Sequence, residues 1–167
     1  NLRCVAVEPT SCPTLTKGAY AYDYGDVSGY TPIMRMYTLG HDFMPPGIHA
    51  GGLRYHGDSP LVSQLLHEGR IEALAVPQVA TFDAGVRFAR AEGIIPAPES
   101  CHAIRAAIDE ALRCKASGEA RTILFNLTGH GHFDMASYDR FLSGKLEDYE
   151  YPAEAIAESL KHLPKVG

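Results

Sequence analysis

Apolar residues recur at intervals of three and four positions through the second half of the chain, and this spacing predicts helices. The clearest helix covers residues 99–118, because its apolar side chains form one stripe and Gly118 follows as a C-terminal cap. Ser59 with Pro60 is a typical helix start, and Gly93 suits a left-handed helix end. Three further helices are therefore predicted, over residues 59–69, 80–93 and 152–163.

Continuous apolar runs alternate with these helices. They predict buried strands over residues 2–7, 71–78 and 121–129, a short strand or turn over 94–100, and an element of undefined type over 31–39. Strands separated by helices of this length predict an α/β fold, in which helices flank a mostly parallel sheet in three layers. Ligands of such sheets bind beyond the carboxyl ends of the strands, which places Glu8 and Thr128 at the functional edge.

Residues 10–57 interrupt this alternation. They are rich in glycine, proline, tyrosine and histidine, and no hydrophobic period persists through them. We predict an irregular insert here, and a stretch of this length inside a compact domain usually carries function. Its tyrosines either cover an exposed sheet edge or subunit contact, or line a substrate pocket, and the sequence leaves both alternatives open.

Charge and cysteine content narrow the class of protein. The net charge of −5 does not favour a nucleic-acid-binding surface, and no apolar run reaches the ~18–20 residues of a membrane span. The four cysteines form no C-x-x-C pair, which is typical of reduced thiols in a cytoplasmic protein. The chain begins without methionine, and we expect it to be a piece of a longer protein or a processed one.

The candidate chemistry lies in residues 125–134, which read FNLTGHGHFD. A metal site would need a further ligand beyond His130, His132 and Asp134, and no second cluster supplies one, so we expect no metal centre. The alternatives for Thr128 are that it simply ends a strand, or that its hydroxyl and the two glycines after it approach a ligand.

Five segments together carry a resemblance to a known family. They are VAVEPTSCPTLTKG (5–18), YTLGHDF (37–43), IHAGGLRYHG (48–57), EGIIPAPESCHAI (92–104) and ILFNLTGHGHFD (123–134). In this order they resemble tryptophan synthase β chains, and most closely the second branch of that family, which usually acts without a tightly bound α subunit. The resemblance implies a partial fold-type-II enzyme domain that depends on pyridoxal 5′-phosphate (PLP). The whole chain, residues 1–167, would be the C-terminal part of such a β chain.

The resemblance also implies roles around the cofactor ring. Thr128 matches a serine whose hydroxyl faces the pyridine nitrogen, with Gly129 beside it, and Glu99 matches a glutamate next to the ring. A neutral hydroxyl donates to an unprotonated ring nitrogen, whereas a carboxylate would stabilise the protonated ring. From the residues alone, Glu99 could equally be a first-turn acid that favours the helix dipole.

Further implied roles concern the substrate. Asp42, flanked by Gly40, matches an aspartate that contacts the serine hydroxyl and helps to switch between open and closed states. His130 replaces an arginine that pairs with this aspartate, and such a pair would weaken as the imidazole loses its proton near ~6.5. Backbone carbonyls near Phe43 match the site of a monovalent cation.

The same resemblance exposes what these residues lack. The lysine that binds the cofactor covalently, the catalytic glutamate near indole and the glycine-rich phosphate loop belong to upstream segments that do not appear here. Two hypotheses follow. The chain is part of a tryptophan synthase β chain, or of a related PLP-dependent β-elimination or β-replacement enzyme, and is inactive alone; or it is a non-catalytic binding fragment. The first implies L-serine and indole as substrates and a homodimer, and it leaves an α subunit open.

Overall fold

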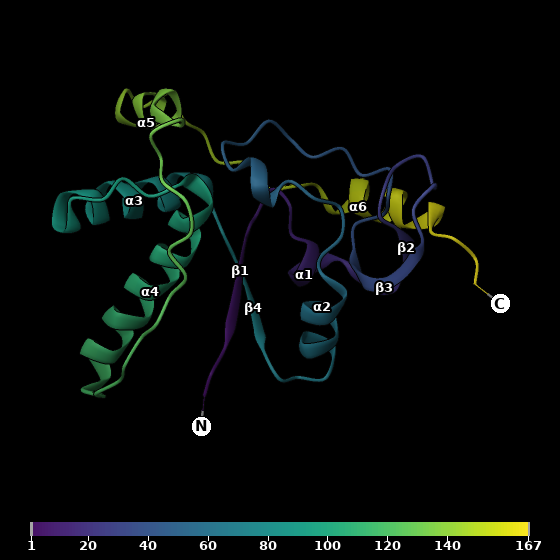
Figure 1. The fold of residues 1–167 in the computed structure, drawn as a ribbon, viewed down its shortest axis with the longest axis horizontal. Coiled ribbons are helices and arrows are strands. Elements are labelled where there is room, and N and C mark those ends of the chain that lie inside the picture. Colours follow the sequence, from purple (N-terminus) through teal and green to yellow (C-terminus); the bar gives the residue numbers. More distant parts are fainter. Residues whose placement is uncertain (1, 167) are drawn as a thin grey trace. The chain divides into compact units, whose positions relative to one another are not determined.

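The computed structural model describes residues 2–166, which form two compact units (Figure 1). The first unit contains residues up to Gly47, Leu53–Ala75 and the C-terminal segment from Tyr149. The second contains Ile48–Gly52 and Val76–Asp148. Each unit is therefore built from segments that lie far apart in the sequence.

A parallel pair of strands lies in the first unit. Strand β1 (Val5–Pro9) lies beside β4 (Glu72–Val76), and the Glu72 N–H donates a hydrogen bond of 2.9 Å to the Cys4 carbonyl. Both strands confirm the predicted positions, although β1 begins later than expected and Leu2 is 89% exposed. The expected burial is wrong for most of β4, in which only Val76 is buried and Leu74 is 40% exposed. The two strands run in the same direction with helices between them in sequence, so the α/β class is confirmed.

An antiparallel hairpin occupies the stretch that was predicted to be irregular. Strand β2 (Ala19–Tyr24) pairs with β3 (Ile33–Thr38), with Ala19 opposite Thr38 and Tyr24 opposite Ile33. The prediction of an irregular insert is wrong for these residues. The reason is that β2 alternates small or acidic side chains with tyrosines, which suits the two faces of a pleated strand.

The remaining elements of the first unit are short. They are α1 (Thr14–Lys17), α2 (Pro60–His67), α6 (Ala153–Ser159) and the 3₁₀ turn η2 (Leu160–His162); a further 3₁₀ turn, η1, covers Gly51–Leu53. Helix α2 starts at Pro60 as predicted, but it contacts the hairpin through Ser63, whose hydroxyl accepts a 2.9 Å hydrogen bond from the Tyr37 N–H. Leu61, in contrast, is 76% exposed.

Three helices make up most of the second unit: α3 (Gln78–Glu92), α4 (Pro98–Ser117) and α5 (Met135–Leu142). Phe82, Cys101, Tyr138 and Leu146 form its buried core. The first two helices confirm the predictions, and both end at a glycine in the left-handed conformation, Gly93 with φ 72° and Gly118 with φ 74°. Helix α5 was not predicted.

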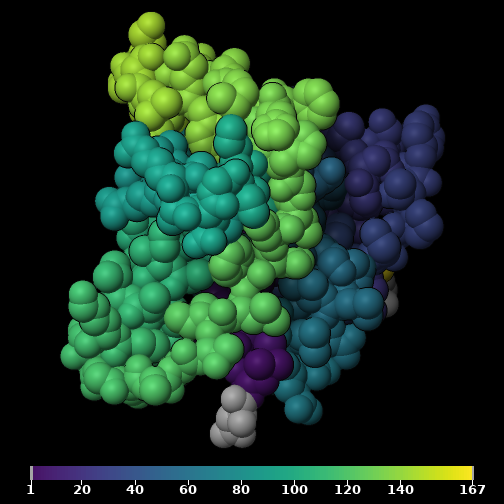
Figure 2. Space-filling model, turned by 60° about the vertical axis from the view of Figure 1, so that its left-hand side comes forward, coloured from purple at the N-terminus to yellow at the C-terminus, as the bar shows by residue number. Residues whose placement is uncertain are grey.

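The stretch between α4 and the Thr128 loop is not a strand. Residues 119–128 have no regular secondary structure and lie on the surface beside α3 and α4, as the green segment in Figure 2 shows. Leu124 is 95% exposed. The prediction of a buried strand here is wrong for the described chain, because no strand of residues 2–166 pairs with this segment, and an unpaired extended segment gains no ladder hydrogen bonds.

Helix α4 is the longest helix within residues 2–166, and its two faces differ in polarity. It buries Cys101 and Ile104 on one face. Its other face carries ion pairs between Arg105 and Asp109 and between Arg113 and Glu110. Within residues 2–166, no helix combines the length and the apolar character needed to cross a membrane.

Candidate cofactor and substrate site

The Thr128 loop has a fixed backbone in the second unit. The Ser100 hydroxyl, on the first turn of α4, donates to the Thr128 carbonyl and accepts a 3.1 Å hydrogen bond from the Thr128 N–H. Gly129 adopts a φ of 74°, a conformation that favours glycine. Further along, the Gly131 N–H donates to the Ile95 carbonyl at 2.9 Å. The loop is therefore fixed to the segment before α4 by backbone contacts.

The Thr128 side chain, in contrast, has no hydrogen-bond partner among residues 2–166. Thr128 is exposed, and its hydroxyl makes no hydrogen bond within residues 2–166. A hydroxyl at a fixed position that is not used internally can donate to, or accept from, a bound group. The predicted role of Thr128 toward a ring nitrogen thus fits the local geometry, although Thr128 does not end a strand.

Glu99 lies in the first turn of α4, as predicted. Its Oε1 accepts a 2.8 Å hydrogen bond from the Gly52 N–H, and a side chain at Gly52 would meet the Glu99 Cγ at 3.2 Å. Glu99 is therefore more than an acid that favours the helix dipole, since it also holds a glycine-rich turn. Its charge, after the effect of desolvation, also contributes to raising the pKa of Asp134.

The rings of the two loop histidines lie close together and are tilted by 40° relative to one another. The His130 ring lies 4.6 Å from the His132 ring and 5.5 Å from the Phe133 ring, measured between centroids. The His132 N–H donates to His130 Nδ1 at 3.2 Å. Across residues 2–166, no group of three His, Cys, Asp or Glu side chains is arranged to hold a metal ion.

Another histidine of this unit, His49, lies in the segment whose histidines the sequence left without a role. Its Nδ1 lies 3.0 Å from the Ser137 hydroxyl on α5, and its N–H donates to Gln78 Oε1 at 2.9 Å. Desolvation, and then the charge of Arg140, lower the pKa of His49. No sequence pattern links His49 to residues nearly ninety positions away.

Two buried nitrogens have no hydrogen-bond partner within the described chain: Nε of Arg54 in the first unit and Nε2 of His102 in the second. His102 follows Glu99 by one helical turn, and its Nδ1 is already used by the Pro98 carbonyl at 2.9 Å. Burial lowers the pKa of His102. Because native proteins rarely leave buried polar atoms unpaired, water or a further part of the protein can supply these partners.

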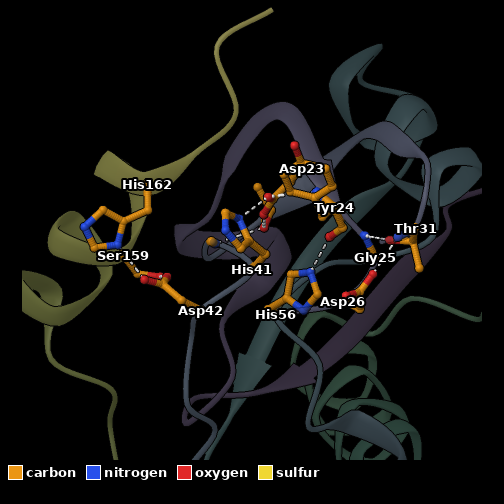
Figure 3. A network of polar contacts seen from close by, with 12 residues as sticks. Asp23, Tyr24, Gly25, Asp26, Thr31, His41, Asp42, His56, Ser159 and His162 are labelled. Atoms are coloured by element: carbon orange, nitrogen blue, oxygen red, sulfur yellow. Dashed lines mark hydrogen bonds and ion pairs between the residues drawn. The ribbon is translucent and has the colours of Figure 1, made fainter. Parts of the chain in front are cut away.

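Gly40 and Asp42, which were predicted for the substrate, and Phe43, which was predicted near a monovalent cation, form a tight turn in the first unit. Asp42 is labelled in Figure 3. The Phe43 N–H donates to the Gly40 carbonyl at 2.9 Å, and Gly40 has a φ of 95°. Asp42 Oδ1 accepts a hydrogen bond from the Ser159 hydroxyl, and Oδ2 accepts one from His162 Nδ1, each at 2.5 Å. Asp42 thus has partners from the C-terminal segment, which the sequence did not indicate, and its pairing with His130 stays a prediction.

A buried acid supports this turn from inside (Figure 3). Asp23 is fully buried in β2 and accepts hydrogen bonds at 2.7 Å from both the Thr38 hydroxyl and His41 Nδ1. The Thr38 hydroxyl in turn accepts the Gly40 N–H at 2.9 Å. Asp23 is a structural residue that sequence reasoning missed, because in a tyrosine-rich stretch it resembles an ordinary surface acid.

Comparison with known proteins places this arrangement in a family. Residues 1–129 match the family described as pyridoxal-phosphate dependent enzyme, which is more than half of the 167 residues. The chain therefore belongs to the PLP-dependent enzyme family, and the predicted cofactor class and the partial fold-type-II domain are confirmed. The match ends at Gly129, so it includes Glu99 and Thr128.

Individual relatives agree with this assignment. The chain is 65% identical over 147 residues to tryptophan synthase beta chain 2 of Methanosarcina mazei, which covers 88% of this chain and 33% of that protein. It is 63% identical over 148 residues to the protein of the same name from Aquifex aeolicus, covering 89% and 34%. It is 58% identical over 146 residues to tryptophan synthase beta chain of Pyrococcus horikoshii, covering 87% and 32%.

These similarities confirm the resemblance to tryptophan synthase β chains. The chain spans about a third of the length of the curated relatives it matches. The residues present fit one part of a PLP site, since the Thr128 hydroxyl is exposed and makes no hydrogen bond in the described part of the chain, while Ser100 fixes the Thr128 backbone.

Proposed function

We propose that this chain is part of a tryptophan synthase β chain, which joins L-serine to indole and yields L-tryptophan and water. The observation that carries the proposal is the 58–65% identity to proteins of that name over most of this chain. In this reaction the C–O bond at the serine β-carbon breaks and a C–C bond from indole forms. The hydroxyl leaves as water with the proton that indole loses.

Thr128, Gly129 and Glu99 would hold the cofactor ring. When bound, PLP supplies an electron-withdrawing ring that acidifies the α-proton of serine. The Thr128 hydroxyl would donate to the pyridine nitrogen without protonating it, and Gly129 would let the ring approach the backbone. Glu99, fixed by the Gly52 N–H, would lie beside the ring.

Asp42 would accept a hydrogen bond from the serine β-hydroxyl, with Gly40 providing the turn that presents it. Partial burial acts to raise the pKa of Asp42, but hydrogen bonds from Ser159 and His162 outweigh it and lower the pKa below its usual value. An ionised carboxylate can only accept. Asp42 would therefore orient the hydroxyl and would not supply the proton that the leaving group takes up.

Three finer features complete the proposal. His130 would pair with Asp42 when the substrate is enclosed, and backbone carbonyls near Phe43 would bind a monovalent cation. The complete protein would work as a homodimer in the cytoplasm, with or without an α subunit. The free thiols of Cys12, Cys101 and Cys114 support a reducing compartment.

The test uses the complete protein that carries these residues. Thr128→Val keeps the shape and removes the hydroxyl, and Thr128→Ser keeps the hydroxyl as the matched control. We expect the valine variant to lose about 10- to 100-fold in tryptophan formation from L-serine and indole, with a shifted cofactor absorbance, because a hydrogen bond to the ring is lost. Equal rates for valine and wild type would contradict the ring-nitrogen role.

A related β-elimination or β-replacement enzyme is the alternative, and the same preparation distinguishes it. Tryptophan synthesis requires that indole consumption equals serine consumption. Turnover of L-serine to a keto acid without indole incorporation would favour the elimination reaction. No turnover of serine by the complete, PLP-loaded protein would favour a non-catalytic binding role.

A further inference from the structure

The C-terminal segment of the chain, residues 149–162, makes specific contacts with the Gly40–Phe43 turn within the first unit; we call it the C-terminal strap. Figure 3 shows Ser159 and His162 directed at Asp42 from one side. The Ser159 hydroxyl donates to Asp42 Oδ1 and His162 Nδ1 donates to Oδ2. Each carboxylate oxygen thus uses one acceptor position and keeps another.

The turn is shaped to receive the strap. A Cβ atom at Gly40 would lie 2.3 Å from Ser159 Oγ and 2.8 Å from the Ser159 carbonyl oxygen, so only glycine allows this approach. The Phe43 ring, which is buried, lies 4.5 Å from the Tyr151 ring between centroids. Polar and aromatic contacts therefore hold the strap in the same position against the turn.

The start of the strap is held independently of Asp42. The Tyr151 N–H donates to the Thr10 carbonyl at 3.4 Å, and the Thr10 hydroxyl donates to the Tyr149 carbonyl at 3.2 Å. Lys17 pairs with Glu150 at 2.6 Å. Because these contacts lie outside the Asp42 turn, loss of the Ser159 or His162 hydrogen bond leaves the start of the strap in place.

We propose that Ser159 and His162 are positioning residues for Asp42, which fix its carboxylate in the orientation that accepts the substrate hydroxyl. The inference rests on the proposed role of Asp42 toward L-serine. Asp23 fixes the backbone of the turn through its hydrogen bonds with His41 and Thr38. The contacts from the strap therefore act on the orientation of the Asp42 side chain. Two donors on one carboxylate remove the rotation about its χ2 angle that a solvated aspartate retains.

The test is a set of variants of the complete enzyme, measured for KM and kcat with L-serine at saturating indole. Ser159→Ala and His162→Phe remove one donor each, and Ser159→Thr restores the hydroxyl. We expect each loss to raise the KM for L-serine about three- to tenfold with kcat changed less, and threonine at position 159 to recover most of the effect. Lys161→Ala, on the same turn but paired with Glu158, is the matched control and should leave both values unchanged.

A double-mutant cycle separates the inference from the proposed function. If Ser159 and His162 act through Asp42, their removal from Asp42→Asn causes no further rise in the KM for L-serine. Two outcomes would overturn the inference and leave the role of Asp42 intact. In one, the effects on the KM for L-serine of the strap substitutions and of Asp42→Asn are fully additive. In the other, the strap variants have the wild-type KM while Asp42→Asn is impaired. An Asp42→Asn enzyme with an unchanged KM for L-serine would instead remove that role, and the inference with it.

A readout without catalysis completes the test. Amide hydrogen exchange in residues 153–162 reports whether the strap stays on the turn. We expect Asp42→Asn to accelerate exchange there by about threefold or more, because both donors lose their charged acceptor. Unchanged exchange in this segment would show that Asp42 does not hold the strap and would overturn the inference.

Discussion

The Gly40–Phe43 turn and the Thr128–Asp134 loop both carry predicted site residues, but they differ in where their side chains find partners. Asp42 has two internal donors, and the backbone around it rests on buried Asp23. The Thr128 hydroxyl has no partner within residues 2–166, although Ser100 holds its backbone on both sides.

Within residues 2–166, this difference separates a side chain that already has hydrogen-bond donors from one whose hydroxyl has no partner. When a ligand binds to a side chain that has no hydrogen-bond partner on a rigid backbone, little further conformational entropy is lost. A side chain that is already hydrogen-bonded must exchange one partner for another. The free hydroxyl on the loop supports the proposed cofactor contact, and the two donors to Asp42 support its proposed role as a positioned carboxylate. The predictions below test the two descriptions, beginning with the largest expected effect.

Removal of the buried acid under the turn should have the largest effect. Asp23→Ala leaves the Thr38 hydroxyl and His41 Nδ1 without their acceptor inside the unit. We expect the free energy of unfolding of the complete protein to fall by about 3–5 kcal/mol, measured by denaturant titration. A loss below about 1 kcal/mol would mean that the turn does not depend on this network.

Addition of a methyl group at Gly40 should have the next largest effect on the free energy of unfolding. Gly40→Ala meets Ser159 and also requires a left-handed φ, so we expect about 2–4 kcal/mol of destabilisation. Gly118→Ala is the matched control, since it has a comparable φ of 74° but no atom within 4 Å of the added carbon. It should cost only about 1 kcal/mol. Equal losses at both positions would show that the strap does not approach Gly40.

The loop predicts a different pattern. Ser100→Ala removes a buried hydroxyl that bonds the Thr128 backbone twice, and we expect a loss of about 1–2 kcal/mol in the free energy of unfolding. Thr128→Val should change that free energy by less than about 0.5 kcal/mol, because its hydroxyl has no internal partner. A Thr128→Val variant that is as unstable as Ser100→Ala would show that Thr128 serves the fold and not a ligand.

The pH dependence should give the smallest effect, through His102. Burial holds its pKa below the usual 6.5 in the folded chain. The unfolded chain therefore binds the proton on His102 more readily than the folded chain does. The stability that neutral His102 contributes is present above pH 6.5 and is lost as the pH falls toward the pKa of His102 in the folded chain. His102→Gln should lose less stability than wild type between pH 7.5 and 5.5, by denaturant titration. An identical decline in both would contradict a buried neutral imidazole.

The sequence predicted those parts of the fold that depend on local pattern. Helices α3 and α4 follow from a 3.6-residue period that ends at glycine, and β4 from an apolar run that stops at Pro77. The strand predicted over residues 121–129 failed because an apolar run becomes a strand only where a neighbour pairs with it. The β2–β3 hairpin was missed because eight residues separate its strands, so the two-residue turn that marks a hairpin in sequence is absent.

Within the candidate site, only residues that belong to family motifs could be predicted from the sequence. Glu99, Thr128 and Asp42 came from resemblance to a family, and their surroundings did not. The partners of Asp42 lie more than a hundred residues away in sequence, and Asp23 meets His41 through the hairpin register. No local pattern encodes such contacts, because they depend on how separate elements pack.

The measurement that tests the central claim most directly is an experimental structure of the complete protein with PLP bound. The account predicts that the Thr128 hydroxyl lies about 2.7–3.0 Å from the pyridine nitrogen, with Ser100 still bonded to the Thr128 backbone. A carboxylate at that nitrogen, or a Thr128 hydroxyl that is too distant to form a hydrogen bond with the ring, would contradict it.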